Sequence, residues 1–86
     1  MAIYKILYWQ EVPSQIKAED GEDEVTVPLS HKFLVRIDQL AMERGLDSAD
    51  DYLAQWRWSE EQELPGAARE VAEAVAAELE SGARWP

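Results

Sequence analysis

The chain has 86 residues and no cysteine, and 18 acidic residues against 8 basic ones give a formal net charge of −10. The length favours one domain with a small core, and the lack of cysteine excludes disulfides, thiolate metal sites and cysteine nucleophiles. The charge disfavours nucleic acid and anionic membranes as partners, whereas it would speed encounter with a basic protein.

The first part of the chain, over about residues 2–29, predicts three antiparallel strands joined as a β-meander. Residues 2–10 alternate between two largely apolar sets, which indicates a strand covered on both faces. One set is Ile3, Leu7 and Trp9 with Lys5 among them, and the other is Tyr4, Ile6 and Tyr8. Pro13 interrupts the first ladder because it has no N–H to donate. Asp20-Gly21 predicts a hairpin turn, as type I′ turns favour this pair.

The apolar character of residues 2–10 conflicts with a simple meander, which would place the second strand at the centre of the sheet. A helix packed over one face of the sheet would account for the apolar first strand. A homodimer, with the partner covering the other face, would account for it equally well.

Three helices are expected after the meander, over about residues 31–44, 48–58 and 65–81. Ser30 and Ser48 suit the starts of the first two, because a serine hydroxyl accepts a hydrogen bond from the first turn. Gly45 suits the end of the first helix and Pro65 the first turn of the third. Apolar residues at helical spacing are Phe33, Leu34, Ile37, Leu40 and Ala41 in the first helix and Ala68, Val71, Ala72, Val75 and Leu79 in the third.

These elements predict a single α+β domain, residues 1–86, in which two or three helices pack on a three-stranded antiparallel sheet. The last residues, Arg84-Trp85-Pro86, are expected to form a tail.

No complete catalytic constellation is visible in the sequence. His31 is the only histidine, and Ser30 beside it does not form a nucleophile–base pair, since adjacent residues at a helix start point apart. The acidic segment 19–24 lacks the spacing of an EF-hand and resembles a solvated hairpin tip. We therefore predict a protein that is not an enzyme, with no catalytic residue, no metal and no cofactor.

Polar and aromatic side chains concentrate in the segment 8–15, at a predicted strand end and turn. Its amides and hydroxyl would bind a partner, or they would satisfy the backbone of the turn itself. Trp56 and Trp58 would point about 200° apart on a helix, so that at least one leaves the core as an interface anchor; alternatively, Trp58 covers the sheet after the helix ends. The predicted partner-binding residues are Trp9, Gln10, Pro13, Ser14, Gln15, Trp56 and Trp58.

Part of the chain resembles a ribbon-helix-helix domain. The resemblance rests on Val25-Thr26-Val27-Pro28-Leu29-Ser30, followed by Phe33, Ile37, Leu40, Gly45 and Ser48. It implies a dimeric regulator whose paired strands enter the DNA major groove. However, the strand offers Glu24 and Thr26 and lacks the basic or amide side chains that would face bases.

Nearly the whole chain resembles the small bacterial family named "virulence factor". The resemblance rests on Tyr8-Trp9-Gln10, Pro13-Ser14-Gln15, Lys17, Val25 through Leu29, Ala41-Met42, Gly45-Leu46, Asp51-Tyr52-Leu53 and Gln55-Trp56. The same module is similar to the end of the larger conserved virulence factor C proteins. The family name implies no reaction, but the gene neighbourhood of its members implies a link to corrinoid and folate methyl transfer.

We therefore expect an accessory or adaptor protein that binds a protein partner. The alternatives are a ribbon-helix-helix-like regulator and a small subunit that completes the active site of an enzyme. Residues 1–5 show no charged leader before a long apolar run, and no apolar stretch approaches the ~20 residues needed to span a bilayer. A small soluble protein of the cytoplasm is the simplest expectation.

Overall fold

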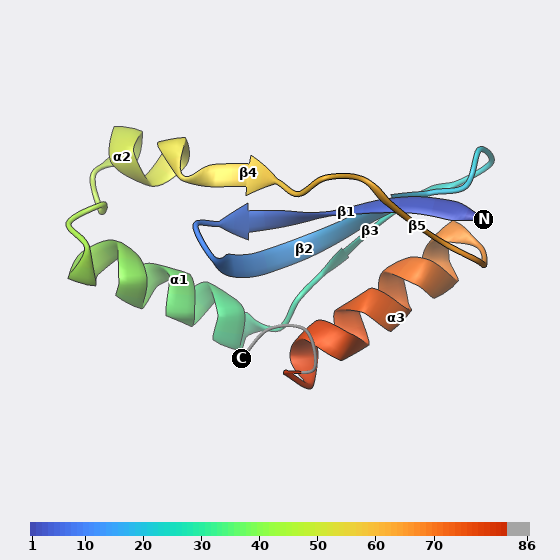
Figure 1. Cartoon of the computed structure of the whole chain (residues 1–86). Coiled ribbons are helices and arrows are strands. Elements are labelled where there is room, and N and C mark those ends of the chain that lie inside the picture. Colours follow the sequence, from blue (N-terminus) through green and yellow to red (C-terminus); the bar gives the residue numbers. More distant parts are fainter. Residues whose placement is uncertain (83–86) are drawn as a thin grey trace.

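The computed structural model describes residues 1–82 and shows a five-stranded antiparallel sheet with three helices (Figure 1). The strands are β1 (Ala2–Trp9), β2 (Val12–Glu19), β3 (Glu24–Pro28), β4 (Trp56–Trp58) and β5 (Gln62–Leu64). The helices are α1 (His31–Glu43), α2 (Ala49–Ala54) and α3 (Ala68–Glu80). The α+β fold and the meander of β1, β2 and β3 are confirmed. The tail predicted at residues 83–86 lies outside the described residues.

The sheet has two strands more than the sequence predicted, and both pair with β1. The strand order is β3-β2-β1-β4, and β5 pairs with the other end of the same edge of β1. β1 is therefore a central strand with hydrogen-bonded partners along both edges. α3 covers the face of β1 that carries Tyr4 and Ile6, which is the first of the two explanations expected for its apolar character. The homodimer stays a prediction.

The second predicted helix, residues 48–58, is wrong in its second half. α2 ends at Ala54, with Gln55 as its C-cap, and Trp56–Trp58 forms β4. Two aromatic residues in three favour a strand, and the free edge of β1 offers backbone groups that need partners. Because side chains alternate along a strand, Trp56 and Trp58 lie on the same face of the sheet and not about 200° apart.

The start of the third helix is also corrected. α3 begins at Ala68 and ends at Glu80, so Pro65 lies before it and not in its first turn. Gly66 has a φ of 122°, in the left-handed region that a helix cannot contain, and it turns the chain between β5 and α3. The carboxylate of Asp20, in the β2–β3 loop, accepts a hydrogen bond of 2.9 Å from the backbone N–H of Ala68.

The β2–β3 hairpin forms where Asp20-Gly21 predicted it, but its turn is not of type I′. Glu19 pairs with Glu24, which leaves four residues in the loop, and only Gly21 among them has a positive φ, of 92°. The side chain of Asp20 instead closes the loop by accepting hydrogen bonds from the backbone N–H groups of Glu22 and Asp23 at 2.9 and 2.8 Å.

The helix ends follow the sequence in part. Ser48 caps α2 by accepting from Asp51 N–H, and Gly45, with a φ of 68°, follows the C-cap of α1 as predicted. Ser30 stands at the N-cap of α1, but its side chain makes no capping bond. Its hydroxyl and its N–H instead donate to the Glu80 carboxylate at 2.7 and 2.8 Å, which ties the start of α1 to the end of α3.

The core consists of two clusters. In the first, α3 covers the sheet face that carries Tyr4, Ile6, Ile16 and Ala18, and all five predicted stripe residues of α3 are buried there. In the second, α1 packs around Trp9 and Val12 at the tip of the β1–β2 hairpin, with Phe33, Ile37, Leu40 and Ala41 buried. Leu34, placed on the predicted stripe of α1, is 44% exposed. On the sheet face opposite α3, the part that lies beyond the second cluster stays accessible.

Candidate partner-binding surface

Two of the predicted contact residues, Trp9 and Pro13, are buried. Trp9 is 0% exposed, and its indole N–H donates a hydrogen bond of 2.9 Å to the backbone carbonyl of Tyr52. The two rings lie 5.4 Å apart between centroids. The fold therefore leaves neither Trp9 nor Pro13 open to a partner, and Trp9 joins the first hairpin to α2.

Gln10 is occupied by contacts within the chain. Its side-chain amide donates to Gln55 Oε1 at 3.0 Å, its backbone N–H donates to the Gln55 carbonyl at 3.2 Å, and Arg44 donates to its Oε1. Arg44 also donates to both carboxylate oxygens of Glu11, at 2.7 and 2.8 Å. Hydrogen bonds from Arg44 lower the pKa of Glu11 to about 2. Of the two roles considered for the turn amides, Gln10 takes the structural one.

Ser14 and Trp56 are half-buried and contribute to the fold. The pairing of β1 with β2 shifts register between Leu7 and Tyr8, so that Ser14 is not opposite any residue of β1. Its carbonyl accepts a hydrogen bond of 2.9 Å from Leu29 N–H. The Trp56 ring meets the Tyr52 ring edge-on at 6.0 Å and packs against the second core cluster.

The remaining predicted residues, Gln15 and Trp58, lie together on the accessible part of the sheet. In the strand pairing, Leu7 is opposite Gln15 on one side and Trp58 on the other. Strand alternation places Ile3 and Lys5 on the same face as Leu7, and Lys17 is directly opposite Lys5. We call this surface the open sheet face: Ile3, Lys5, Leu7, Gln15, Lys17 and Trp58.

The open sheet face combines exposed apolar groups with two lysines. Trp58 is 41% exposed and Ile3 is 37% exposed. The Lys5 ammonium lies 4.9 Å from the centroid of the Trp58 ring, within the range of a cation–π contact. Lys17 pairs with Glu24 on β3 at 3.4 Å. Like charges directly opposite across two strands are unfavourable, so the Trp58 ring and Glu24 offset a repulsion between Lys5 and Lys17.

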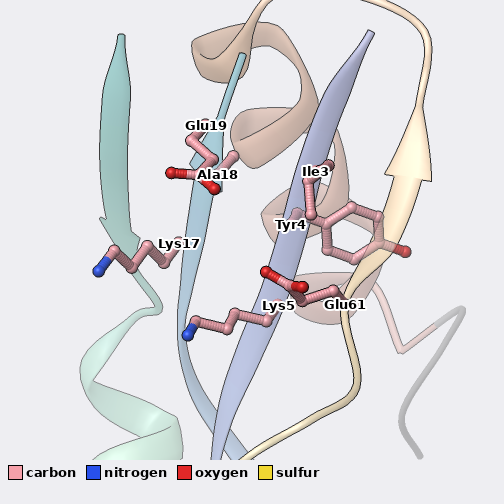
Figure 2. Close-up of a pocket in the computed structure, with 7 residues that line it drawn as sticks. All are labelled: Ile3, Tyr4, Lys5, Lys17, Ala18, Glu19 and Glu61. Carbon is pink, nitrogen blue, oxygen red and sulfur yellow. The ribbon is translucent and has the colours of Figure 1, made fainter. Parts of the chain in front are cut away.

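A small pocket opens on this face between β1 and β2 (Figure 2). Its volume is about 60 Å³, and it is lined by Ile3, Tyr4, Lys5, Lys17, Ala18, Glu19 and Glu61. Figure 2 shows both lysine side chains extending from β1 and β2 toward the β3 side. The pocket has room for a single small group of a partner and not for a substrate-sized molecule.

The sequence did not single out Ile3, Lys5 or Leu7 as surface residues. The signal was the lysine inside an otherwise apolar strand face, together with Lys17 in the next strand. A charged residue that interrupts an apolar face indicates that this face is not fully covered.

The residues that the structure describes show no cluster of side chains arranged as a catalytic site or a metal site. Within residues 1–82, no group of three or more His, Cys, Asp or Glu side chains is placed to hold a metal ion. His31 is exposed at the start of α1. None of the helices in this part of the chain is long and apolar enough to cross a bilayer.

Comparison with known families identifies the chain. The profile of the family described as "Virulence factor" matches residues 7–83. The chain belongs to the virulence factor family. The match spans every strand and helix of the fold except the first residues of β1, and it includes Leu7, Gln15, Lys17 and Trp58 of the open sheet face. No curated protein and no solved structure shows significant similarity to this virulence factor family member.

Proposed function

We propose that this member of the virulence factor family is a non-enzymatic accessory protein that binds a protein partner through the open sheet face. The observation that carries the proposal is Trp58, which is 41% exposed beside Lys5 and Leu7 on the sheet face opposite α3. Tryptophan is the residue type most enriched among the anchors of protein interfaces.

The chemistry of the open sheet face suits recognition. The Trp58 ring and the Ile3 side chain provide apolar area, while Lys5 and Gln15 provide hydrogen-bond donors around it. Trp58 sits on a strand that is paired with β1, so little conformational freedom is lost when a partner binds. We infer a partner that receives the Trp58 ring in an apolar pocket and presents a hydrogen-bond acceptor to the Lys5 ammonium.

The test compares proteins captured by the wild type and by folded variants. Trp58→Ala removes the anchor, and Val35→Ala is a matched control because Val35 is also 41% exposed but lies on α1. We expect a specific partner to be retained by the wild type and by Val35→Ala and to be lost with Trp58→Ala. Retention of the same proteins by all three would refute the proposed surface.

The pathway that the family resemblance implies, corrinoid or folate methyl transfer, stays a prediction, and so does the cytoplasmic location expected from the sequence. It is tested by adding the purified protein to a corrinoid methyltransferase system and recording turnover and the cobalamin absorption spectrum. Unchanged kinetics with a stable complex supports an accessory role. Turnover that requires the protein would instead support the role of a small subunit completing an active site.

The ribbon-helix-helix alternative assigns the DNA contact to β3. This strand pairs with β2 of the same chain over five residue pairs, and it is the last strand of the described sheet, so no strand of residues 1–82 lies along its other edge. Its exposed side chains include Glu24 and Thr26, which carry no positive charge for a phosphate backbone. A gel shift with genomic DNA fragments at low salt tests the alternative directly.

A further inference from the structure

α1 and α2 border a second surface feature, a groove with a volume of about 450 Å³. It is lined by Asp38, Ala41, Met42, Asp47 and Tyr52. Figure 1 shows α1 and α2 at the end of the molecule opposite the β2–β3 loop. The groove contains none of the residues of the open sheet face, so it is a separate surface.

The apolar part of the groove is accessible. Met42 is 73% exposed, although Ala41 beside it is buried in the second core cluster. A methionine side chain is flexible and polarizable, and it adapts its shape to the apolar side chain of a partner. Exposed apolar groups that lie together with polar groups around them mark interaction sites.

The polar part of the groove is acidic and is not neutralised from within. Asp38 and Asp47 form no ion pair with a cationic side chain of residues 1–82. Between residues 38 and 53 the acidic residues are Asp38, Glu43, Asp47, Asp50 and Asp51, and the only basic residue is Arg44. Arg44 is engaged by Glu11 at 2.7 Å. The field at the groove therefore attracts cations.

The charge of Asp38 also reaches the Tyr52 side chain. Burial raises the pKa of the Tyr52 phenol, and the negative charge of Asp38 raises it further. A tyrosine phenol is protonated at neutral pH even without this shift, so the Tyr52 hydroxyl is a hydrogen-bond donor at the groove.

We propose that this groove binds a protein segment that places an apolar side chain between two lysine or arginine side chains. The apolar side chain would contact Met42 and Ala41, and the two cations would pair with Asp38 and Asp47. The net charge of −10 would speed the encounter with such a segment. This proposal does not rest on the open sheet face. An experiment that refutes binding at one of the two surfaces leaves the proposal for the other unaffected.

The first test uses the two methionines of the chain as reporters. Met42 and Met1 are matched in exposure, at 73% and 74%, but only Met42 lines the groove. Protein labelled with ¹³C in the methionine methyl groups is titrated with a synthetic peptide of alternating leucine and lysine, at physiological salt. We expect the Met42 methyl signal to shift and the Met1 signal to stay. An unmoved Met42 signal, or equal shifts of both signals, overturns the proposal.

The second test separates the groove from the general acidity of the protein. Asp38→Asn with Asp47→Asn removes two charges from the groove, and Glu60→Gln with Glu63→Gln removes two charges outside it. Two exposed ion pairs predict a loss of peptide affinity of about five-fold for the groove variant, against less than about two-fold for the control. Equal losses in both variants would show attraction by net charge alone and would overturn the proposal. A peptide of alternating leucine and glutamate should not bind the wild type.

Discussion

Asp20 shows how a single carboxylate connects distant parts of this chain. It accepts hydrogen bonds from the backbone N–H groups of Glu22, Asp23 and Ala68, and these bonds lower its pKa from 3.8 to about 2. Because the folded pKa lies below the unfolded one, the stabilisation is fully present above about pH 4 and is lost as the pH falls through 2. One residue thus closes the β2–β3 loop and holds the first turn of α3.

Replacing Asp20 should destabilise the fold in a pH-dependent way. We expect Asp20→Asn to lower the free energy of unfolding at pH 7, and we expect its difference from the wild type to shrink between pH 4 and pH 2. Urea unfolding at several pH values measures this difference. Asp23→Asn is the control, because the Asp23 backbone and not its side chain takes part in the loop. A difference for Asp20→Asn that does not change with pH would contradict the account.

Trp9 and Trp58 should separate stability from binding. Trp9 is fully buried, so Trp9→Ala should lower the free energy of unfolding by about 3–5 kcal/mol, which is most of the stability of a marginal domain. Trp58 is 41% exposed, and Trp58→Ala should cost no more than about 1 kcal/mol. Urea unfolding followed by circular dichroism compares the two. Similar losses for both variants would mean that Trp58 is a core residue.

The individual core residues were predictable where periodicity acts alone, as the buried stripe Val71, Ala72 and Val75 of α3 shows. Trp9 was not, because an amphipathic ring beside a turn suits a surface as well as a core. Its burial depends on the carbonyl of Tyr52, 43 residues further along the chain. No local pattern predicts a partner at that separation.

At the scale of elements, α3 is held at both ends by carboxylates that bridge to other segments. Asp20 binds its first N–H, and at its last residue Glu80 accepts two hydrogen bonds from Ser30 and lies 3.6 Å from Lys32. The hydroxyl and N–H of Ser30 lower the pKa of the Glu80 carboxyl. The start of α1 is therefore fixed by α3 and not by a local cap.

Glu80→Gln should loosen the junction of α1 and α3 without unfolding the sheet. Loss of the charged acceptor is expected to speed amide hydrogen exchange at the start of α1 by up to about ten-fold, the size of a lost helix cap. Exchange in β1 and β2 should not change. Glu63→Gln, on the short strand β5, provides a matched loss of charge. Equal effects of the two substitutions would contradict a specific role for Glu80.

The elements also show where prediction from sequence ends. The meander and the long helices α1 and α3 have enough residues for their periods to be recognised. β4 and β5 have three residues each, and both are strands because β1 offers them a free edge. A segment this short carries no period of its own, so Trp56–Trp58 was assigned to the helix before it. The open sheet face was not predictable from the sequence for the same reason, because Trp58 reaches this face only through the pairing of β4 with β1.

At the scale of the whole molecule, the charge is unevenly arranged. The chain carries a net charge of −10, and on the open sheet face Lys5 and Lys17 lie among carboxylates, because Glu19 and Glu61 line the same pocket and Glu24 pairs with Lys17. In the groove beside α1 and α2, Asp38 and Asp47 form no ion pair within residues 1–82. The two surfaces therefore differ in whether cations accompany the carboxylates and in their apolar anchor, so we expect them to bind partners of different chemistry.

The central claim is that Trp58 anchors a protein partner, and isothermal titration calorimetry with the purified partner tests it most directly. We predict binding that is about 30-fold weaker for Trp58→Ala than for the wild type, equivalent to an anchor worth about 2 kcal/mol, with Val35→Ala unchanged. Equal affinity of the wild type and both folded variants would contradict the claim.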